Sequence, residues 1–152
     1  MSIAECLSQL SGSAFRQLPP ASAGAVRALE VAAAGPLPVE LRELYHLSNG
    51  LEEYLHVGQD EELMVGYLVL PAEEAAAENR KARQNPQSLT EAELVIFAHT
   101  YTDGGRFAYR RDDLPAASAA VYLWLPLEDE LTKIANSLPA FLLGWATGQI
   151  RI

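Results

Sequence analysis

The segment LVIFAHTYTDGGRFAYR, residues 94–110, contains two strands and the turn that joins them. Its first five residues are uniformly apolar, which is typical of a strand that is buried on both faces. Asp103-Gly104-Gly105 tolerates the positive backbone angles that tight turns need, so it predicts a hairpin. The residues that follow alternate as far as Arg111, with Phe107 and Tyr109 on one face. The segment therefore predicts an antiparallel pair of strands.

Two more strands are predicted, one on each side of this hairpin in the sequence. Residues 63–70 (LMVGYLVL) form an apolar run of strand length, and Gly66 within it indicates a bulge or a close approach of another backbone. Residues 120–125 (AVYLWL) predict a strand that Pro126 ends. The apolar residues after it recur instead with helical spacing, at Leu127, Leu131, Ile134 and Leu138.

Helices are predicted before, between and after the strands. Ser22 can cap a helix that Gly35-Pro36 ends, with the glycine as its left-handed residue. Glu73 and Glu74 in the first turn of a helix opened by Pro71 suit the positive end of the helix dipole. Residues 12–21 are expected to form a loop. The predicted helices occupy residues 3–10, 22–34, 38–48, 72–83 and 137–147.

The order of these elements predicts one α+β domain. We expect an N-terminal helix pair, a largely antiparallel sheet of about four strands, and a C-terminal helix packed on that sheet. The 152 residues are the length of a single domain, without a linker or an internal repeat. Residues 1–24 are expected to be an N-terminal extension with a short helix, residues 25–148 the domain, and residues 149–152 a tail.

The composition is that of a soluble globular protein, with 49% hydrophobic and 20% charged residues. No apolar run approaches the ~18 residues that span a membrane, so no membrane contact is expected. Cys6 is the one cysteine. It excludes an intramolecular disulfide and favours a reducing compartment, and we expect a cytoplasmic protein.

The charge of the chain is strongly negative and unevenly distributed. Eleven Lys and Arg against twenty Asp and Glu give a net charge of −9, and residues 51–80 alone carry −7. Direct nucleic-acid binding is disfavoured because it needs clustered Lys and Arg. The acidic residues favour a protein partner with a basic surface, since opposite charge speeds association. The alternative interpretation is that these acidic residues bind no partner and only keep the protein soluble.

Several short motifs follow one another from about Ala25 to Gly148. In chain order these are Leu37-Pro38, Leu41, Tyr45, Asn49-Gly50, Leu70-Pro71, Ile96-Phe97, Asp103-Gly104-Gly105, Phe107, Tyr109, Ile134-Ala135-Asn136-Ser137 and Phe141-Leu142. In the order and spacing of these motifs, rather than in one of them, the chain resembles the SUKH superfamily.

The resemblance implies a non-enzymatic domain. Many bacterial members of this superfamily are immunity proteins that bind and silence toxins, often nucleases or deaminases, and fungal members regulate cell-wall synthesis. The shared residues look like determinants of the fold, so no catalytic position is transferred. This implication about function is associative, because one fold serves many functions.

The residues themselves predict no catalytic residue, no cofactor and no metal site. His46, His56 and His99 lie in unrelated contexts, without the spacing of a metal-binding motif. Cys6 has no histidine near it in sequence, and no glycine-rich loop of the phosphate-binding type occurs. A glycosidase pair of carboxylates stays an alternative, because acids distant in sequence can meet in the fold.

The candidate partner-binding residues lie in two acidic clusters and at one aromatic position. Both clusters are expected on exposed connections, where recognition residues are common. Tyr54 and Tyr101 are candidate aromatic anchors, because buried aromatic side chains carry much of an interface's energy. Glu128-Asp129-Glu130 is expected to complement a helix N-terminus. The candidates are Glu52, Glu53, Tyr54, Asp60, Glu61, Glu62 and Tyr101.

The sequence thus predicts a protein-binding module without enzymatic activity. The favoured hypothesis is an immunity protein that occludes the active surface of a nuclease or deaminase toxin. One alternative is a regulatory or scaffold protein that binds cellular partners without a toxin. A second is a hydrolase, which would need a deep pocket with convergent polar groups. The oligomeric state is not predicted.

Overall fold

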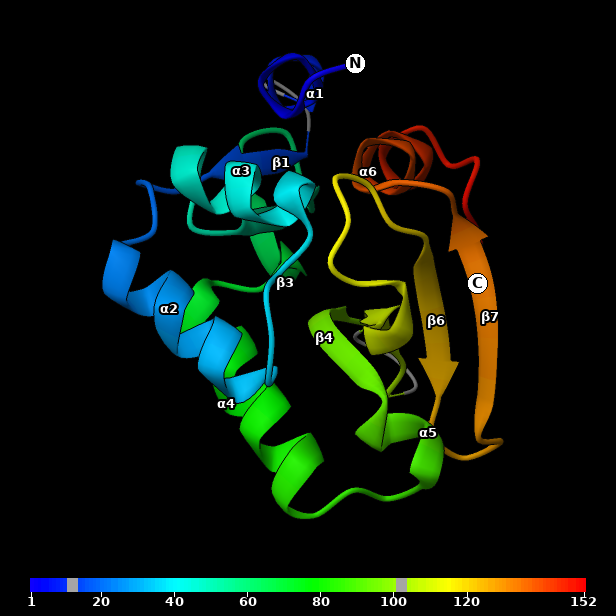
Figure 1. Ribbon diagram of the computed structural model, residues 1–152. Coiled ribbons are helices and arrows are strands. Elements are labelled where there is room, and N and C mark those ends of the chain that lie inside the picture. Colours follow the sequence, from blue (N-terminus) through cyan, green and yellow to red (C-terminus); the bar gives the residue numbers. More distant parts are fainter. Residues whose placement is uncertain (11–13, 101–103) are drawn as a thin grey trace.

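A computed structural model of the chain describes residues 1–10, 14–100 and 104–152, and it shows helices packed around two antiparallel sheets (Figure 1). The elements in chain order are α1 Ile3–Leu10, β1 Phe15–Gln17, α2 Ala23–Ala32, α3 Val39–Leu47, β2 Leu51–His56, β3 Glu62–Val69, α4 Ala72–Gln84, α5 Leu89–Ala92, β4 Leu94–His99, β5 Arg106–Arg110, the short 3-10 helix Arg111–Asp113, β6 Val121–Leu125, β7 Glu130–Ala135 and α6 Leu138–Ala146.

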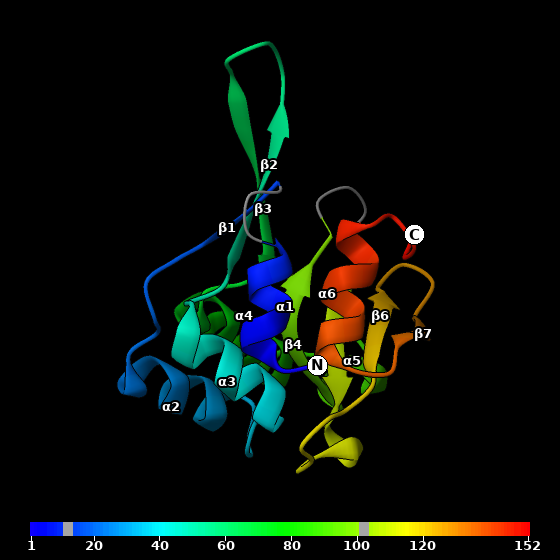
Figure 2. The same ribbon diagram turned by 90° about the horizontal axis from the view of Figure 1, so that it is seen from above.

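The fold contains two sheets, which contact each other where β3 ends beside β4. One has the strand order β1-β2-β3 and the other β4-β5-β6-β7, and every pairing is antiparallel. The Leu70 N–H, just after β3, donates to the Phe97 carbonyl of β4 at 2.9 Å. α6 packs on the four-stranded sheet, α1 lies beside α6 and also contacts α3 and β1, and α2 packs along α4 (Figures 1 and 2). The expected α+β class, with antiparallel strands and a C-terminal helix on the sheet, is confirmed.

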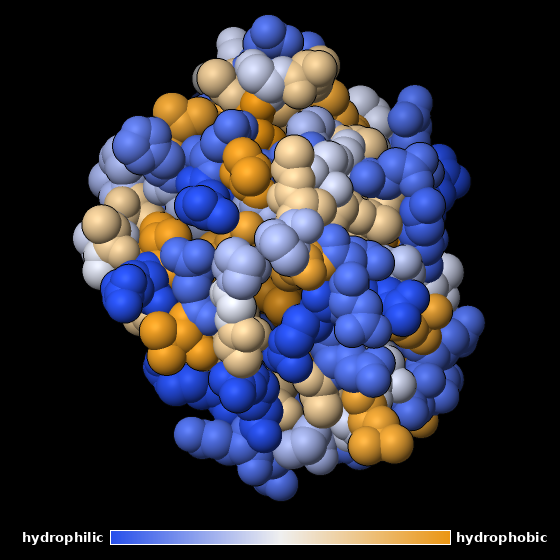
Figure 3. Space-filling view, viewed as in Figure 1, coloured by the Kyte–Doolittle hydropathy of each residue, from blue (hydrophilic) through white to orange (hydrophobic). Residues whose placement is uncertain are grey.

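The main core lies between this sheet and the helices. Its centre is aromatic: Phe97 stacks on Tyr109 with ring centroids 4.9 Å apart, and Phe141 of α6 lies 4.8 Å from Phe107. The α1 side chains Ile3, Cys6, Leu7 and Leu10 are buried in the same core. On the face drawn in Figure 3, hydrophobic side chains show as small separate patches among hydrophilic ones.

The expected double-sided burial of residues 94–98 is confirmed. Val95 and Phe97 belong to the main core, whereas Leu94 and Ile96 pack on the other face with Trp124. Two predicted helix caps are present as well. The Ser22 hydroxyl accepts from the Ala25 N–H, and the Ser137 hydroxyl accepts from the Ala140 N–H, at the starts of α2 and α6.

Asn49-Gly50 links the end of α3 to the end of β3 and the start of α4. The Asn49 Oδ1 accepts the N–H of Ala72 at 2.8 Å, and its Nδ2 donates to the Glu73 carboxylate at 3.0 Å, so Asn49 caps α4 from another part of the chain. Gly50 has a φ of +97°, and a Cβ there would lie 2.6 Å from the Val69 carbonyl oxygen. The pair therefore permits a close backbone approach that fixes where α4 begins.

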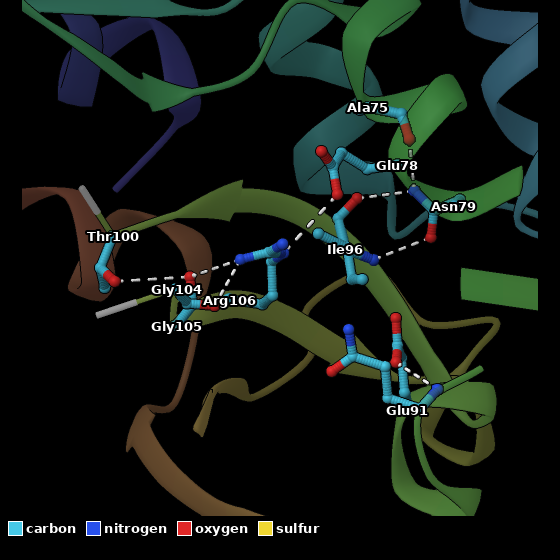
Figure 4. Close-up of polar contacts among 10 residues, drawn as sticks. Ala75, Glu78, Asn79, Glu91, Ile96, Thr100, Gly104, Gly105 and Arg106 are labelled. Atoms are coloured by element: carbon cyan, nitrogen blue, oxygen red, sulfur yellow. Dashed lines mark hydrogen bonds and ion pairs between the residues drawn. The ribbon is translucent and has the colours of Figure 1, made fainter. Parts of the chain in front are cut away.

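Asn79 connects α4 to β4. Its buried amide donates to the Ala75 and Ile96 carbonyls at 2.7 Å, and its Oδ1 accepts the Ile96 N–H at 2.9 Å (Figure 4). The Asn79 amide thus takes the place of the backbone groups of a neighbouring strand. Both the N–H and the C=O of Ile96 therefore have hydrogen-bond partners.

Two predictions around the last strand were wrong. Residues 130–135 form strand β7 and not a helix, and residues 126–129 form the turn that joins it to β6. Asp129 takes a φ of +48° there and accepts the Trp124 indole N–H at 3.0 Å, so the acids of this segment do not cap a helix. The helical spacing of the apolar residues gave the wrong prediction because β7 is an edge strand. Its apolar residues are only half-buried and show no strand-like alternation.

Three local predictions near the N-terminal half also differ from the structure. Residues 15–17, expected in a loop, form the short strand β1. Residues 51–56 form strand β2 and not an exposed connection. Ala34, with a φ of +60°, takes the left-handed conformation after α2 in place of Gly35. The register shift beside Gly66 agrees with the expected bulge.

Cys6 is fully buried in the core, and burial, helped by the nearby Glu40 charge, raises the pKa of its thiol to about 11. At about pH 8 the thiolate population is therefore very small, and the thiolate is the reactive form. We expect the native protein to react with Ellman's reagent at least ~100-fold more slowly than the unfolded chain. Equal rates before and after addition of guanidinium would contradict this burial.

No helix in the described part of the chain is long and apolar enough to cross a membrane.

Candidate protein-binding hairpin

The β2–β3 hairpin, residues 51–69, projects from the rest of the molecule with its outer half (Figure 2). Its base is held in the core by Leu51 and Val69, which are opposite each other and fully buried. Exposure rises toward the turn, and Leu55 is already 54% exposed. The outer half of the hairpin is thus open to solvent on both faces.

The outer half carries several exposed apolar side chains. Leu55 and Leu63 are direct cross-strand partners, and Tyr54 and Met64 form the next pair. Leu63 is 55% exposed and Val57 53% exposed. Exposed apolar side chains gathered on one projecting element are typical of an interaction surface, whereas scattered ones need no explanation.

The same hairpin is strongly acidic. Residues 51–69 contain five carboxylates and no Lys or Arg. Glu62 is paired with Arg16 of β1, and the His56 Nε2 lies 3.7 Å from its other oxygen. Asp60 and Glu61, in the turn, are exposed and have no ion-pair partner among residues 1–10, 14–100 and 104–152. Their charges are available to a partner.

Tyr54 adds an aromatic side chain to this surface. Its hydroxyl donates to the Glu52 carboxylate at 2.7 Å, and the Arg16 guanidinium lies 4.8 Å from the ring centroid. The hydrogen bond to Glu52 is the main cause that raises the pKa of Tyr54 above its usual value of 10. The Tyr54 hydroxyl therefore stays protonated, and the side chain is held in place between Glu52 and Arg16.

Glu53 has a different environment, because its carboxylate accepts the Trp145 indole N–H of α6 at 3.0 Å. Trp145 in turn packs edge-on against Phe107, with ring centroids 5.5 Å apart. This bond ties the base of the hairpin to the main core, which restricts how the hairpin can tilt.

Six of the seven candidate residues thus come together on the β2–β3 hairpin, and Tyr101 lies outside the described residues. The sequence pattern missed the apolar part of this surface, Leu55, Val57, Leu63 and Met64. The run LMVGYLVL did contain the signal, because its first residues follow three acids directly and a buried strand seldom begins there.

Among the described residues, hollows away from the hairpin include the two that follow. The larger, about 990 Å³, lies between α1, α2 and α3 and is lined mainly by apolar side chains such as Val26, Val39 and Leu47. The smaller, between α2 and α4, includes Arg27, Arg80 and Arg83. Within the described residues, no group of three or more His, Cys, Asp or Glu side chains could hold a metal ion.

The sequence model of the SMI1 / KNR4 family (SUKH-1) matches residues 20–144, which run from just before α2 to most of α6. The chain belongs to the SMI1 / KNR4 family. The resemblance noted in the sequence is thereby confirmed. None of the curated proteins compared with the chain matches it.

Membership in the SMI1 / KNR4 family points to a role in protein–protein interaction, of the immunity or regulator type. Its members are generally binding modules without enzymatic activity. The family match includes the whole β2–β3 hairpin. The acidic and apolar surface described above therefore lies inside the family domain.

Proposed function

We propose that this protein is a bacterial immunity protein that neutralises a toxin with a basic surface, of the nuclease or deaminase type, by binding and occlusion. The observation that supports it best is the β2–β3 hairpin, where exposed apolar side chains and unpaired carboxylates share one projecting element. Apolar area supplies affinity and the carboxylates supply steering and specificity.

A nucleic-acid-acting toxin suits this surface chemically. Such an enzyme needs clustered Lys and Arg to bind its phosphate-rich substrate. A chain of net charge −9, with five carboxylates on one hairpin, would be drawn to that cluster and would compete with the substrate for it. Binding in the reducing cytoplasm, where the toxin acts, agrees with the single free cysteine.

The other two functions have weaker support. A hydrolase needs convergent polar groups in a pocket. The larger hollow has mainly apolar walls, and the most strongly raised pKa values belong to Tyr45 and Tyr109, which are buried in the core. A regulator would use the same hairpin on a cellular partner. A toxin gene beside the gene for this protein, and rescue of growth by co-expression, would favour immunity over regulation.

Replacing Asp60, Glu61 and Glu62 together by alanine is expected to slow association with the basic partner about tenfold at low salt. The rate deficit should shrink as salt rises, because screening shortens the reach of the charges. Stopped-flow association with the protein encoded beside the gene is the measurement.

The matched control removes three exposed carboxylates far from the hairpin, Asp112, Glu128 and Glu130, and so changes the net charge equally. The control should associate nearly as fast as the unaltered protein. If both triple variants slow association to the same extent, the location of the hairpin charges does not matter and this part of the proposal fails.

A further inference from the structure

β3 is the last strand of its sheet, and its outer edge is open along the first half of the strand. The strand order is β1-β2-β3, so β3 has β2 on one side and no hydrogen-bonded strand on the other within the described residues. Its contact with the four-stranded sheet comes at the opposite end, where the Leu70 N–H donates to Phe97. Residues 62–66 project beyond that contact (Figure 2).

The hydrogen-bond pattern identifies which backbone groups face outward. In antiparallel pairs, residues that bond to each other alternate with residues whose N–H and C=O point away. The Val57 N–H donates to the Glu61 carbonyl at 3.0 Å, so that pair is bonded. The Tyr54 N–H donates instead to the Ala14 carbonyl at 2.7 Å, away from β3.

By this alternation, the pairs His56–Glu62 and Tyr54–Met64 are not hydrogen-bonded to each other. The N–H and C=O groups of Glu62 and Met64 therefore point outward from β3. They offer two donors and two acceptors in the spacing that a further strand would use.

Exposed apolar side chains flank this open edge. Leu63, with Leu55 beside it, is on one face of the hairpin and Met64 is on the other. Soluble proteins usually protect such an edge with short strands, charges or a covering element, because an open apolar edge pairs with other chains. Here the protection is electrostatic, from Glu61 and Glu62 at the start of the strand.

We propose that an extended segment of the partner protein, with alternating basic and apolar side chains, adds to the outer edge of β3 as a new strand. The inference rests on the proposed binding function and specifies how the partner is held. Backbone hydrogen bonds would come from Glu62 and Met64, and apolar contacts from Leu63 on one face. On the other face Glu62, which Arg16 also contacts, would form the cross-strand ion pair.

A second copy of this chain is the less suitable occupant. Two copies paired edge to edge would bring Glu61 and Glu62 of each close to the same carboxylates of the other, and like charges opposite each other destabilise a sheet. The basic hollow of the chain, with Arg27, Arg80 and Arg83, lies between two helices, which offer no strand edge.

The test replaces one backbone donor and leaves the hairpin intact. Because the Met64 N–H points away from β2, Met64→Pro removes an outward donor without removing a hydrogen bond of the hairpin, and proline is tolerated on edge strands. Met64→Ala is the matched control, since it shortens the side chain and keeps the N–H. The probe is a capped nonapeptide of alternating Lys and Val, titrated into the ¹⁵N-labelled protein.

The unaltered protein and Met64→Ala should bind the peptide within about threefold of each other, and the Glu62 and Met64 amide signals should shift on binding. Met64→Pro should bind at least about tenfold more weakly, because one backbone hydrogen bond and the register are lost. If Met64→Pro unfolds, Glu62→Pro replaces it, because the first residue of a strand accepts proline.

Equal peptide binding by the proline variant, shifts confined to α1, α2 and α3, no binding of the peptide at all, or a dimer formed through this edge in sedimentation would each overturn the proposal. These outcomes are distinct from failure of the proposed function. A basic toxin that binds Met64→Pro as tightly as the unaltered protein would leave the immunity function standing and remove only strand addition.

Discussion

Replacing Gly50 by alanine is expected to lower the free energy of unfolding by about 3 kcal/mol. Two costs combine: a left-handed backbone at a residue with a side chain, and the displacement of neighbouring atoms by an added methyl group. Gly50 has a φ of +97°, and the new Cβ would meet the Val69 carbonyl oxygen at 2.6 Å and the Pro71 nitrogen at 3.0 Å. Neither is the end of a flexible side chain, so the backbone must shift.

Chemical denaturation of both variants measures this effect, with Gly148→Ala as the control. Gly148 also has a positive φ, of +75°, but nothing lies within 4 Å of its added Cβ. The Gly148→Ala variant should lose only about 1 kcal/mol of unfolding free energy, because the left-handed backbone is its one source of strain. Equal losses in the two variants would show that the close approach of Gly50 to Val69 costs nothing.

Replacing Asn79 by leucine is expected to cost about 3 to 4 kcal/mol of unfolding free energy. The change keeps the size of the side chain but leaves the buried N–H and C=O of Ile96 without partners, and each unsatisfied group costs about 1–3 kcal/mol. The two bonds to Ile96 measure 2.9 Å and 2.7 Å, and Asn79 is 1% exposed.

The neighbouring Glu78→Gln is the control for this variant, again by chemical denaturation. Glu78 lies 3.6 Å from the Arg106 guanidinium in a partly exposed ion pair. Pairs of this kind contribute under about 1 kcal/mol. If Asn79→Leu were no more destabilising than Glu78→Gln, the hydrogen bonds from Asn79 of α4 to Ile96 of β4 would not contribute to the stability of the fold.

The elements with a strong local signal could be predicted from the sequence. Residues 94–98 are buried on both faces, so the strand shows as an unbroken apolar run. The caps Ser22 and Ser137 mark helix starts by a side chain that bonds the first turn, which needs no information from the rest of the fold. Pro71 and the acids after it marked the start of α4 in the same local way, although the Asn49 cap of that helix comes from a distant part of the chain.

Three other strands, β1, β2 and β7, could not be predicted in the same way. β2 and β7 expose much of both faces, so neither shows an alternation of apolar and polar residues. β1 has three residues, and its pairing with β2 is a contact distant in sequence. The role of Asn79 was equally hidden, because an asparagine inside a helix gives no sign that its partner is a strand.

The candidate site was predicted in part. The uneven charge identified the acidic residues of the hairpin, since charge is a property of the sequence alone. Exposure is not, and so the apolar half of the surface needed the structure: Leu55 and Leu63 are exposed because the hairpin extends past the core. The bond from Trp145 to Glu53 also joins residues too far apart in sequence to be paired by inspection.

The account depends on the β2–β3 hairpin as the surface that meets a basic protein. The most direct test titrates the ¹⁵N-labelled protein with the toxin domain encoded beside its gene and maps the amide signals that change. We predict changes in residues 54–66, with the signals of α2 and α3 at the larger hollow unaltered. Changes confined to that hollow, with residues 54–66 unaffected, would contradict the account.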